Sequence, residues 1–213
     1  MEIHDLFFGD TPLVSWVHEA HPAHEPWVTL ALARDALAAQ QAHSAIEHLQ
    51  AVAAMPGLES RQYLEAWHAL RELGVRAPAE ISKRVLGVVV EVSLPEGLDV
   101  LAAYSDGTAR YMNWSGAGVV WEAPNARFQS DIETLLRAGA TIAQRIGPWN
   151  EPRRGRPPEG HIRLSMLTPS GLHFGEGPME ALARDALAGP LVSAATVLMR
   201  GLTSLPKSNS SER

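Results

Sequence analysis

The hydrophobic pattern of this chain changes its period near residue 84, and this change restricts the folds that the chain can adopt. Before residue 84, apolar residues recur every three or four positions, which is typical of helices that bury one face. After it, residues 85–92 form a valine-rich run of strand length. The sequence therefore predicts an α+β protein, with a helical region at 1–82, a sheet domain at 83–206 and a disordered polar tail at 207–213.

The helical region contains three amphipathic segments, at about 27–41, 44–55 and 60–73. Pro56-Gly57 ends the second segment and Gly74 ends the third, because both residue types interrupt helices. Short connections of this kind predict antiparallel neighbouring helices.

Part of this region resembles a tetratricopeptide repeat. The residues that resemble the second helix of one unit and the first helix of the next are Ala45-Ile46-Glu47, Leu49, Pro56 and Glu65–Leu70. The resemblance covers residues 27–74 and implies a protein-interaction role without chemistry. A lone pair of antiparallel helices with an alanine-rich seam explains the same pattern.

The sheet domain is expected to begin with an antiparallel meander and to be flanked by helices. The expected strands lie at about 85–92, 98–104, 108–114, 119–122, 162–168 and 172–175. An amphipathic helix is expected at 131–146, where Gly139 on the apolar stripe allows close approach to a strand, and the last helix at about 191–205. This order resembles a profilin- or roadblock-type platform.

Composition excludes several classes of function. The chain has no cysteine, which excludes disulfides, thiolate metal sites and a cysteine nucleophile. No apolar run is long enough to span a bilayer, and residues 1–5 lack the basic start of a signal peptide, so we expect no membrane association and a cytoplasmic location. Abundant alanine, with arginine strongly preferred over lysine, suggests a GC-rich bacterial genome.

Negative charge gathers in the first part of the chain. Residues 1–82 carry eleven acidic and four basic residues, a net charge of -7, whereas the whole chain carries -6. A solvated acidic face explains this asymmetry, and so does a partner with a basic surface. Nucleic-acid binding is not expected, because phosphate recognition needs a basic surface.

Three histidines, His18, His21 and His24, are spaced three residues apart. Imidazoles at this spacing share one face of a helix and suit zinc, copper or nickel. Pro22 forbids a regular helix across the triplet, so exposed loop histidines are the alternative.

The hairpin at residues 105–116 concentrates aromatic and polar groups. Its candidate ligand-binding residues are Arg110, Tyr111, Asn113 and Trp114, because aromatic rings stack on a ligand while arginine and asparagine bind its edge. Alternatively, the aromatic residues of the hairpin fill the core and Arg110 extends outward.

A further candidate pocket surrounds His173 and Glu176. His173 is a candidate base oriented by Glu176, with Ser165 or Ser170 as nucleophile, and the glycines at 175 and 177 would expose amides at a helix start. A structural turn that needs small residues is the alternative. In the proline-rich loop 147–160, three arginines at 153, 154 and 156 suit phosphates, an acidic partner or docking on the acidic helical half of the chain.

The leading functional hypothesis is a non-enzymatic adaptor or assembly factor that needs no cofactor and binds a protein partner or a second copy of itself. The first alternative is a small-molecule-binding protein or hydrolase with a pocket around His173, Glu176 and Arg110. The second alternative is a metal-binding protein that uses His18, His21 and His24.

Overall fold

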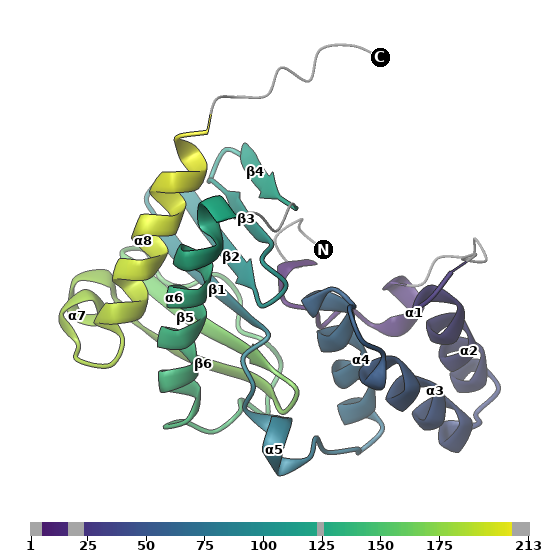
Figure 1. Cartoon of the computed structure of the whole chain (residues 1–213). Coiled ribbons are helices and arrows are strands. Elements are labelled where there is room, and N and C mark those ends of the chain that lie inside the picture. The colour runs from purple at the N-terminus through teal and green to yellow at the C-terminus, as the bar shows by residue number, and fades with distance from the viewer. Residues whose placement is uncertain (1–5, 17–23, 123–125, 206–213) are drawn as a thin grey trace, which may run out of the picture.

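The computed structural model describes residues 6–16, 24–122 and 126–205. His18, His21 and the predicted tail at 207–213 lie outside these residues. The described chain has a group of helices followed by a six-stranded antiparallel sheet and further helices, which confirms the α+β class (Figure 1). The division at residue 83 into two domains stays a prediction.

The first part of the chain forms the predicted helices. They are α2 (Trp27–Ala38), α3 (Ala42–Ala54) and α4 (Ser60–Glu72). Two short additional helices are α1 (Leu13–Trp16) and α5 (Ala79–Ser82). Consecutive helices α2, α3 and α4 pack on one another around Leu30, Leu49 and Leu70. A capping box between Glu59 and Gln62 satisfies the free amides at the start of α4 and so fixes where that helix begins.

The sheet has the strand order β4-β3-β2-β1-β5-β6, and all its pairs are antiparallel. Its strands are β1 (Gly87–Leu94), β2 (Gly97–Tyr104), β3 (Ala109–Met112), β4 (Gly118–Trp121), β5 (His161–Thr168) and β6 (Gly171–Pro178). Gly107 has a φ of 84° in the β2–β3 turn, the left-handed conformation that glycine adopts readily in tight hairpin turns.

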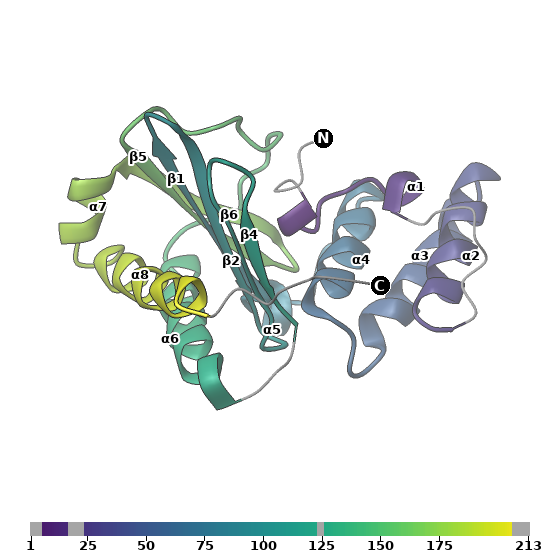
Figure 2. The same cartoon turned by 90° about the horizontal axis from the view of Figure 1, so that it is seen from above.

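One face of the sheet is covered by α6 (Ala126–Ala143) and α8 (Gly189–Thr203), with the short α7 (Met179–Arg184) between β6 and α8 (Figure 2). We call it the helix-covered face. Val88, Val90 and Met166 project into this core. A Cβ atom on Gly139 would lie 2.7 Å from Cγ2 of Val88, so glycine is what permits α6 to approach β1, as predicted.

The opposite face, which we call the patchwork face, is covered by segments that are distant in sequence. The sheet residues Val89, Val100 and Tyr104 are covered there by Phe7 and Phe8 from the N-terminal segment and by Leu64 from α4. The Tyr104 hydroxyl donates to the carbonyl of Phe7 at 2.7 Å. Burial of apolar side chains therefore joins the helical region to the sheet.

Two predicted boundaries differ in ways that affect the candidate sites. β6 continues to Pro178, so residues 175–177 pair with β5 and do not form a helix start. β3 ends at Met112, so Asn113 and Trp114 lie in the β3–β4 turn. At β6, pairing with β5 overrides the local glycine pattern. At Asn113, the side-chain oxygen accepts hydrogen bonds from the amides of residues 115 and 117, which favours a turn over a longer strand.

Candidate functional site

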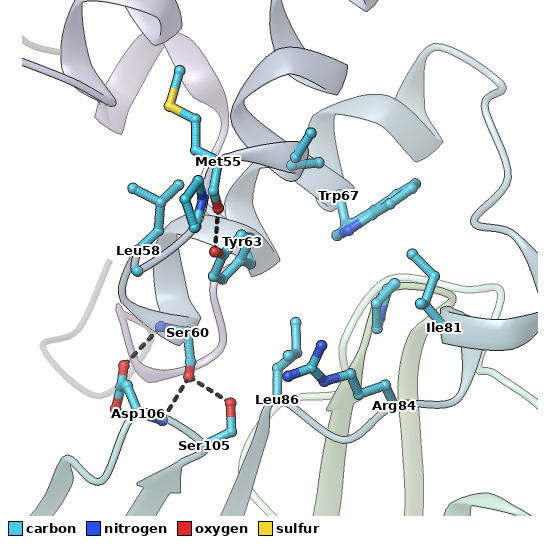
Figure 3. A pocket seen from close by; sticks show the side chains of 15 residues that line it. Met55, Leu58, Ser60, Tyr63, Trp67, Ile81, Arg84, Leu86, Ser105 and Asp106 are labelled. Atoms are coloured by element: carbon cyan, nitrogen blue, oxygen red, sulfur yellow. Dashed lines mark hydrogen bonds between the residues drawn. The ribbon is translucent and has the colours of Figure 1, made fainter.

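A cleft of about 410 Å³ lies where the helical region meets the turn end of the sheet (Figure 3). One wall comes from the end of α3, the following loop and α4. The other comes from α5, the residues between α5 and β1, and the turns after β2 and β5. The cleft lies between the α3–α4 helices and the end of the sheet, whose side chains do not fill the space between them.

Apolar side chains form slightly more than half of the lining of the cleft. The large apolar side chains that line it are Met55, Leu58, Trp67, Ile81 and Leu86. Pro56-Gly57 ends α3 and turns the chain, and Gly57 has a φ of 73°. The Tyr63 hydroxyl donates to the carbonyl of Met55, which holds this loop against α4.

A polar corner closes one end of the cleft. The Asp106 carboxylate accepts the Ser60 amide at 2.7 Å, and the Asp106 amide donates to the Ser60 hydroxyl at 3.1 Å. The hydroxyls of Ser60 and Ser105 lie 2.8 Å apart. These reciprocal bonds cap α4 against the β2–β3 turn, and a hydroxyl held this way without a neighbouring base is not an activated nucleophile.

Arg84 supplies the remaining charge in the cleft. Among the described residues, its guanidinium group has no hydrogen-bond or ion-pair partner, and the side chain extends beside Leu86 (Figure 3). The indole N–H of Trp67 also makes no hydrogen bond to the described residues and faces the cleft. Both groups are donors only, so the arrangement suits an apolar group that carries an acidic or carbonyl acceptor.

The predicted hairpin residues do not form one site. Tyr111 donates to Oδ2 of Asp99 at 2.7 Å, on the helix-covered face, whereas Arg110 lies on the patchwork face with Nη2 3.7 Å from Oε1 of Glu122. The side-chain oxygen of Asn113 accepts hydrogen bonds from the amides of residues 115 and 117 and so shapes the turn. The side chain of Trp114 is 54% exposed. Burial lowers the pKa of Arg110.

His173 and Glu176 point to opposite faces of β6, because three positions along a strand reverse the side-chain direction. β2, β1 and β5 also separate them from Arg110 on β3. The structure thus does not bring His173, Glu176 and Arg110 into one pocket, and the proposed base and its orienting carboxylate do not meet.

His173 instead contacts Ser170, one of the two predicted nucleophiles. Ser170 Oγ lies 3.1 Å from Nε2 of His173, and Nδ1 lies 3.2 Å from the carbonyl of Ile146. The imidazole is fully buried, and this burial lowers its pKa, so the neutral ring is favoured. Ser165 is buried on the other face of the sheet, away from His173.

Glu176 belongs to a buried charge cluster that the sequence analysis did not identify. Arg163 donates through Nη2 to Glu176 at 2.6 Å and through Nη1 to Glu91 at 3.3 Å, and the side chains of Arg163 and Glu91 are each only 2% exposed. Burial raises the pKa of Glu91. The available signal was Glu91 itself, a carboxylate within a valine run.

The three loop arginines make contacts within the chain. Arg153 pairs with Asp10 at 3.0 Å, Arg154 lies over the ring of Trp149, and Arg156 donates to Ser93 and the carbonyl of Gly97. Arg163 also donates to the carbonyls of residues 154 and 155. These bonds fasten loop 147–160 over the patchwork face. The loop therefore docks within the chain mainly on the sheet, and only Arg153 reaches the acidic N-terminal half, through Asp10.

The metal hypothesis at His18, His21 and His24 stays a prediction. Across the described ranges, no group of three or more histidine or carboxylate side chains is arranged to hold a metal ion. His24 is exposed, and its two predicted co-ligands fall outside those ranges. No helix in the described part is long and apolar enough to cross a bilayer.

No family model, no curated protein and no solved structure matches this chain. The resemblances to a tetratricopeptide repeat and to a profilin- or roadblock-type platform therefore rest on residues and element order alone.

Proposed function

We propose that this chain is a non-enzymatic adaptor of the bacterial cytoplasm that holds a partner protein's segment in the cleft between helices and sheet. The segment carries a bulky apolar residue beside an acidic side chain or a terminal carboxylate. The observation that carries the proposal is the guanidinium of Arg84, which has no partner among the described residues and lies beside apolar side chains of the cleft.

The chemistry of the walls supports a polypeptide ligand. Trp67, Leu58 and Ile81 offer apolar surface of the kind that anchors partner side chains, and exposed Ala54 and Gly57 leave the rim open. The polar groups of the cleft, Ser60, Ser105 and Asp106, form hydrogen bonds with one another and with the adjacent turn. We therefore assign them a structural role and no catalytic one. Arg84 would supply orientation through a charge-assisted hydrogen bond.

A second candidate function is hydrolysis by Ser170, and it rests on the 3.1 Å contact with His173. Against it, neither of the two large clefts beside this turn is lined by Ser170. Incubation with a fluorophosphonate reagent and intact mass measurement separates the two candidates. The adaptor proposal predicts no labelling, whereas labelling that Ser170→Ala removes would support hydrolysis.

The adaptor proposal is tested by selecting binders from a random peptide library displayed on phage. We expect enrichment of peptides that combine an acid with an adjacent bulky apolar residue. Arg84→Glu should weaken their binding about tenfold, because attraction becomes repulsion at an exposed arginine. Ala54→Trp, which places a large ring at the exposed rim, should abolish it.

Arg76→Glu is the matched control, because Arg76 is exposed, lies outside the cleft and carries the same charge. Its affinity for the selected peptides should equal that of the wild type. Enrichment of peptides that lack an acidic group would contradict the proposal. Equal affinity of the Arg84→Glu and Arg76→Glu variants for the selected peptides would also contradict it.

A further inference from the structure

A second cavity, of about 280 Å³, lies within the sheet domain between the helix-covered face and α8. Its floor is formed by side chains of β1, β2, β3 and β5 that share this face, namely Val90, Val92, Asp99, Leu101, Tyr111 and Ile162. Its roof is a row on α8, namely Val192, Ala195, Thr196 and Met199. Such spacing places the four side chains on one side of the helix.

The cavity follows from how differently the two helices approach the sheet. Gly139 brings α6 close to β1, whereas α8 buries another row, with Leu191, Leu198 and Leu202, in the shared core. The row that remains over the sheet includes the small residues Ala195 and Thr196, which do not fill the space. The Thr196 hydroxyl donates to the carbonyl of Val192 at 2.9 Å, so this wall offers no free donor.

Asp99 gives the cavity one polar end. Its Oδ2 accepts the Tyr111 hydroxyl at 2.7 Å, and its Oδ1 accepts the amide of Trp114 at 2.9 Å. Burial, reinforced by the bond to Asp99, raises the pKa of Tyr111 to about 12, so the phenol stays a donor. Each carboxylate oxygen retains accepting capacity, and no basic residue is among the described residues that line the cavity.

We propose that this cavity binds a small amphiphile with an apolar chain and a primary ammonium head. The chain lies between the sheet and α8, and the ammonium group donates to Asp99. An apolar volume near the lower end of the roughly 300–1,000 Å³ typical of ligand sites, with few placed polar groups, is what such recognition needs. A fatty carboxylate is disfavoured, because it would face the carboxylate of Asp99.

Titration calorimetry at pH 7.5 with octylammonium and octanoate tests this assignment. Octylammonium should bind the wild-type chain at least about tenfold more tightly than octanoate. Asp99→Asn should bring the two affinities together, because it removes the charge but keeps an acceptor for Tyr111. Equal affinities for the wild type, or no binding of either probe, would overturn the proposal.

Two further variants locate the site. Ala195→Leu fills the cavity and should abolish binding, while Val197→Leu, on the exposed side of the same helix, should not change it. Asp99→Asn alone decides the assignment if Ala195→Leu fails to fold. Ala54→Trp at the helix–sheet cleft should leave octylammonium binding intact, which separates this site from the proposed adaptor site. Binding that persists in a folded Ala195→Leu variant would contradict the location.

Discussion

The two faces of the sheet are covered in different ways. On the helix-covered face, two long amphipathic helices bury a continuous apolar core built around residues such as Val88, Met166 and Leu198. On the patchwork face, α4, residues 6–10 and loop 147–160 each cover part of the surface, and polar contacts hold them in place.

This difference shows which contacts a local pattern can encode. A helix stripe is encoded over one stretch of sequence, because period and glycine position determine the buried side. A patchwork cover depends on partners far apart, such as Arg163 and Glu91, which lie 72 residues apart along the chain. The patchwork face should therefore be more sensitive to loss of single polar groups, and the helix-covered face to changes of volume.

The largest expected effect is at Arg163. Arg163→Met leaves Glu91 buried without its cation and removes the bonds to loop 147–160. We expect a loss of about 3–5 kcal/mol in the free energy of unfolding, measured by urea denaturation. Adding Glu91→Gln to this variant should restore part of the loss, since the fully buried member of the two carboxylates then carries no charge. A loss under about 1 kcal/mol would show that the cluster does not stabilise the patchwork face.

The next effect is a pH dependence centred on Glu65 of α4, which is only 5% exposed. Burial raises the pKa of Glu65 to about 8, and Oε2 has no partner among the described residues. Between the ordinary value of 4.5 and pH 8, the folded state keeps a proton that the unfolded state releases, so stability falls as pH rises. Between pH 5 and 8.5, the free energy of unfolding of the wild type should fall by roughly 3–4 kcal/mol more than that of Glu65→Gln.

Urea denaturation of both proteins at these two pH values checks the prediction. Wild type and Glu65→Gln should be closest in stability at pH 5, and the variant should be the more stable protein at pH 8.5. Parallel stability curves would show that Glu65 is ionised in the folded protein.

A volume change tests the helix-covered face. Gly139→Ala places a Cβ 2.7 Å from Val88 and 3.2 Å from Met166, so the helix must shift. Overpacking should outweigh the gain in helix propensity and cost about 1–2 kcal/mol, measured by thermal denaturation. Gly175→Ala is the matched control, because a Cβ there meets no atom within 4 Å. Equal effects of the two substitutions would contradict the close-approach argument.

The smallest expected effect is a difference in stability loss between two tyrosine substitutions, one on each face of the sheet. Tyr104→Phe should cost about 1–2 kcal/mol, because it leaves the buried carbonyl of Phe7 without a donor. Tyr111→Phe should cost less, because water can reach half-buried Asp99 in place of the hydroxyl. Chemical denaturation of the two variants side by side checks the order, and the reverse order would contradict the contrast between the faces.

Much of the fold could be predicted from the sequence, because it is encoded locally. The meander follows from β-branched runs and turn glycines, and Gly139 was correctly identified as the point where α6 approaches the sheet. The predicted site residues were grouped by local composition instead. Once residues 175–177 are known to be strand, the period of two places His173 and Glu176 on opposite faces.

The cleft could not be predicted, since it forms only where distant segments meet. Arg84 stands at the junction between helices and sheet, and no local pattern distinguishes it from a solvated arginine. Asp99 could not be distinguished from the sequence either, because it forms the polar end of the second cavity only once β2 and β3 have paired. Both candidate sites depend on tertiary placement of ordinary residue types.

Hydrogen exchange with a selected peptide tests the central claim that a partner segment occupies the cleft. The amides of Gly57 and Leu58 make no backbone hydrogen bond to the described residues, so they should exchange quickly in the free protein. With peptide bound, we predict slower exchange at residues 55–60 and 84–86, and no change at β4. Slower exchange confined to other surfaces, with residues 55–60 unaffected, would contradict the account.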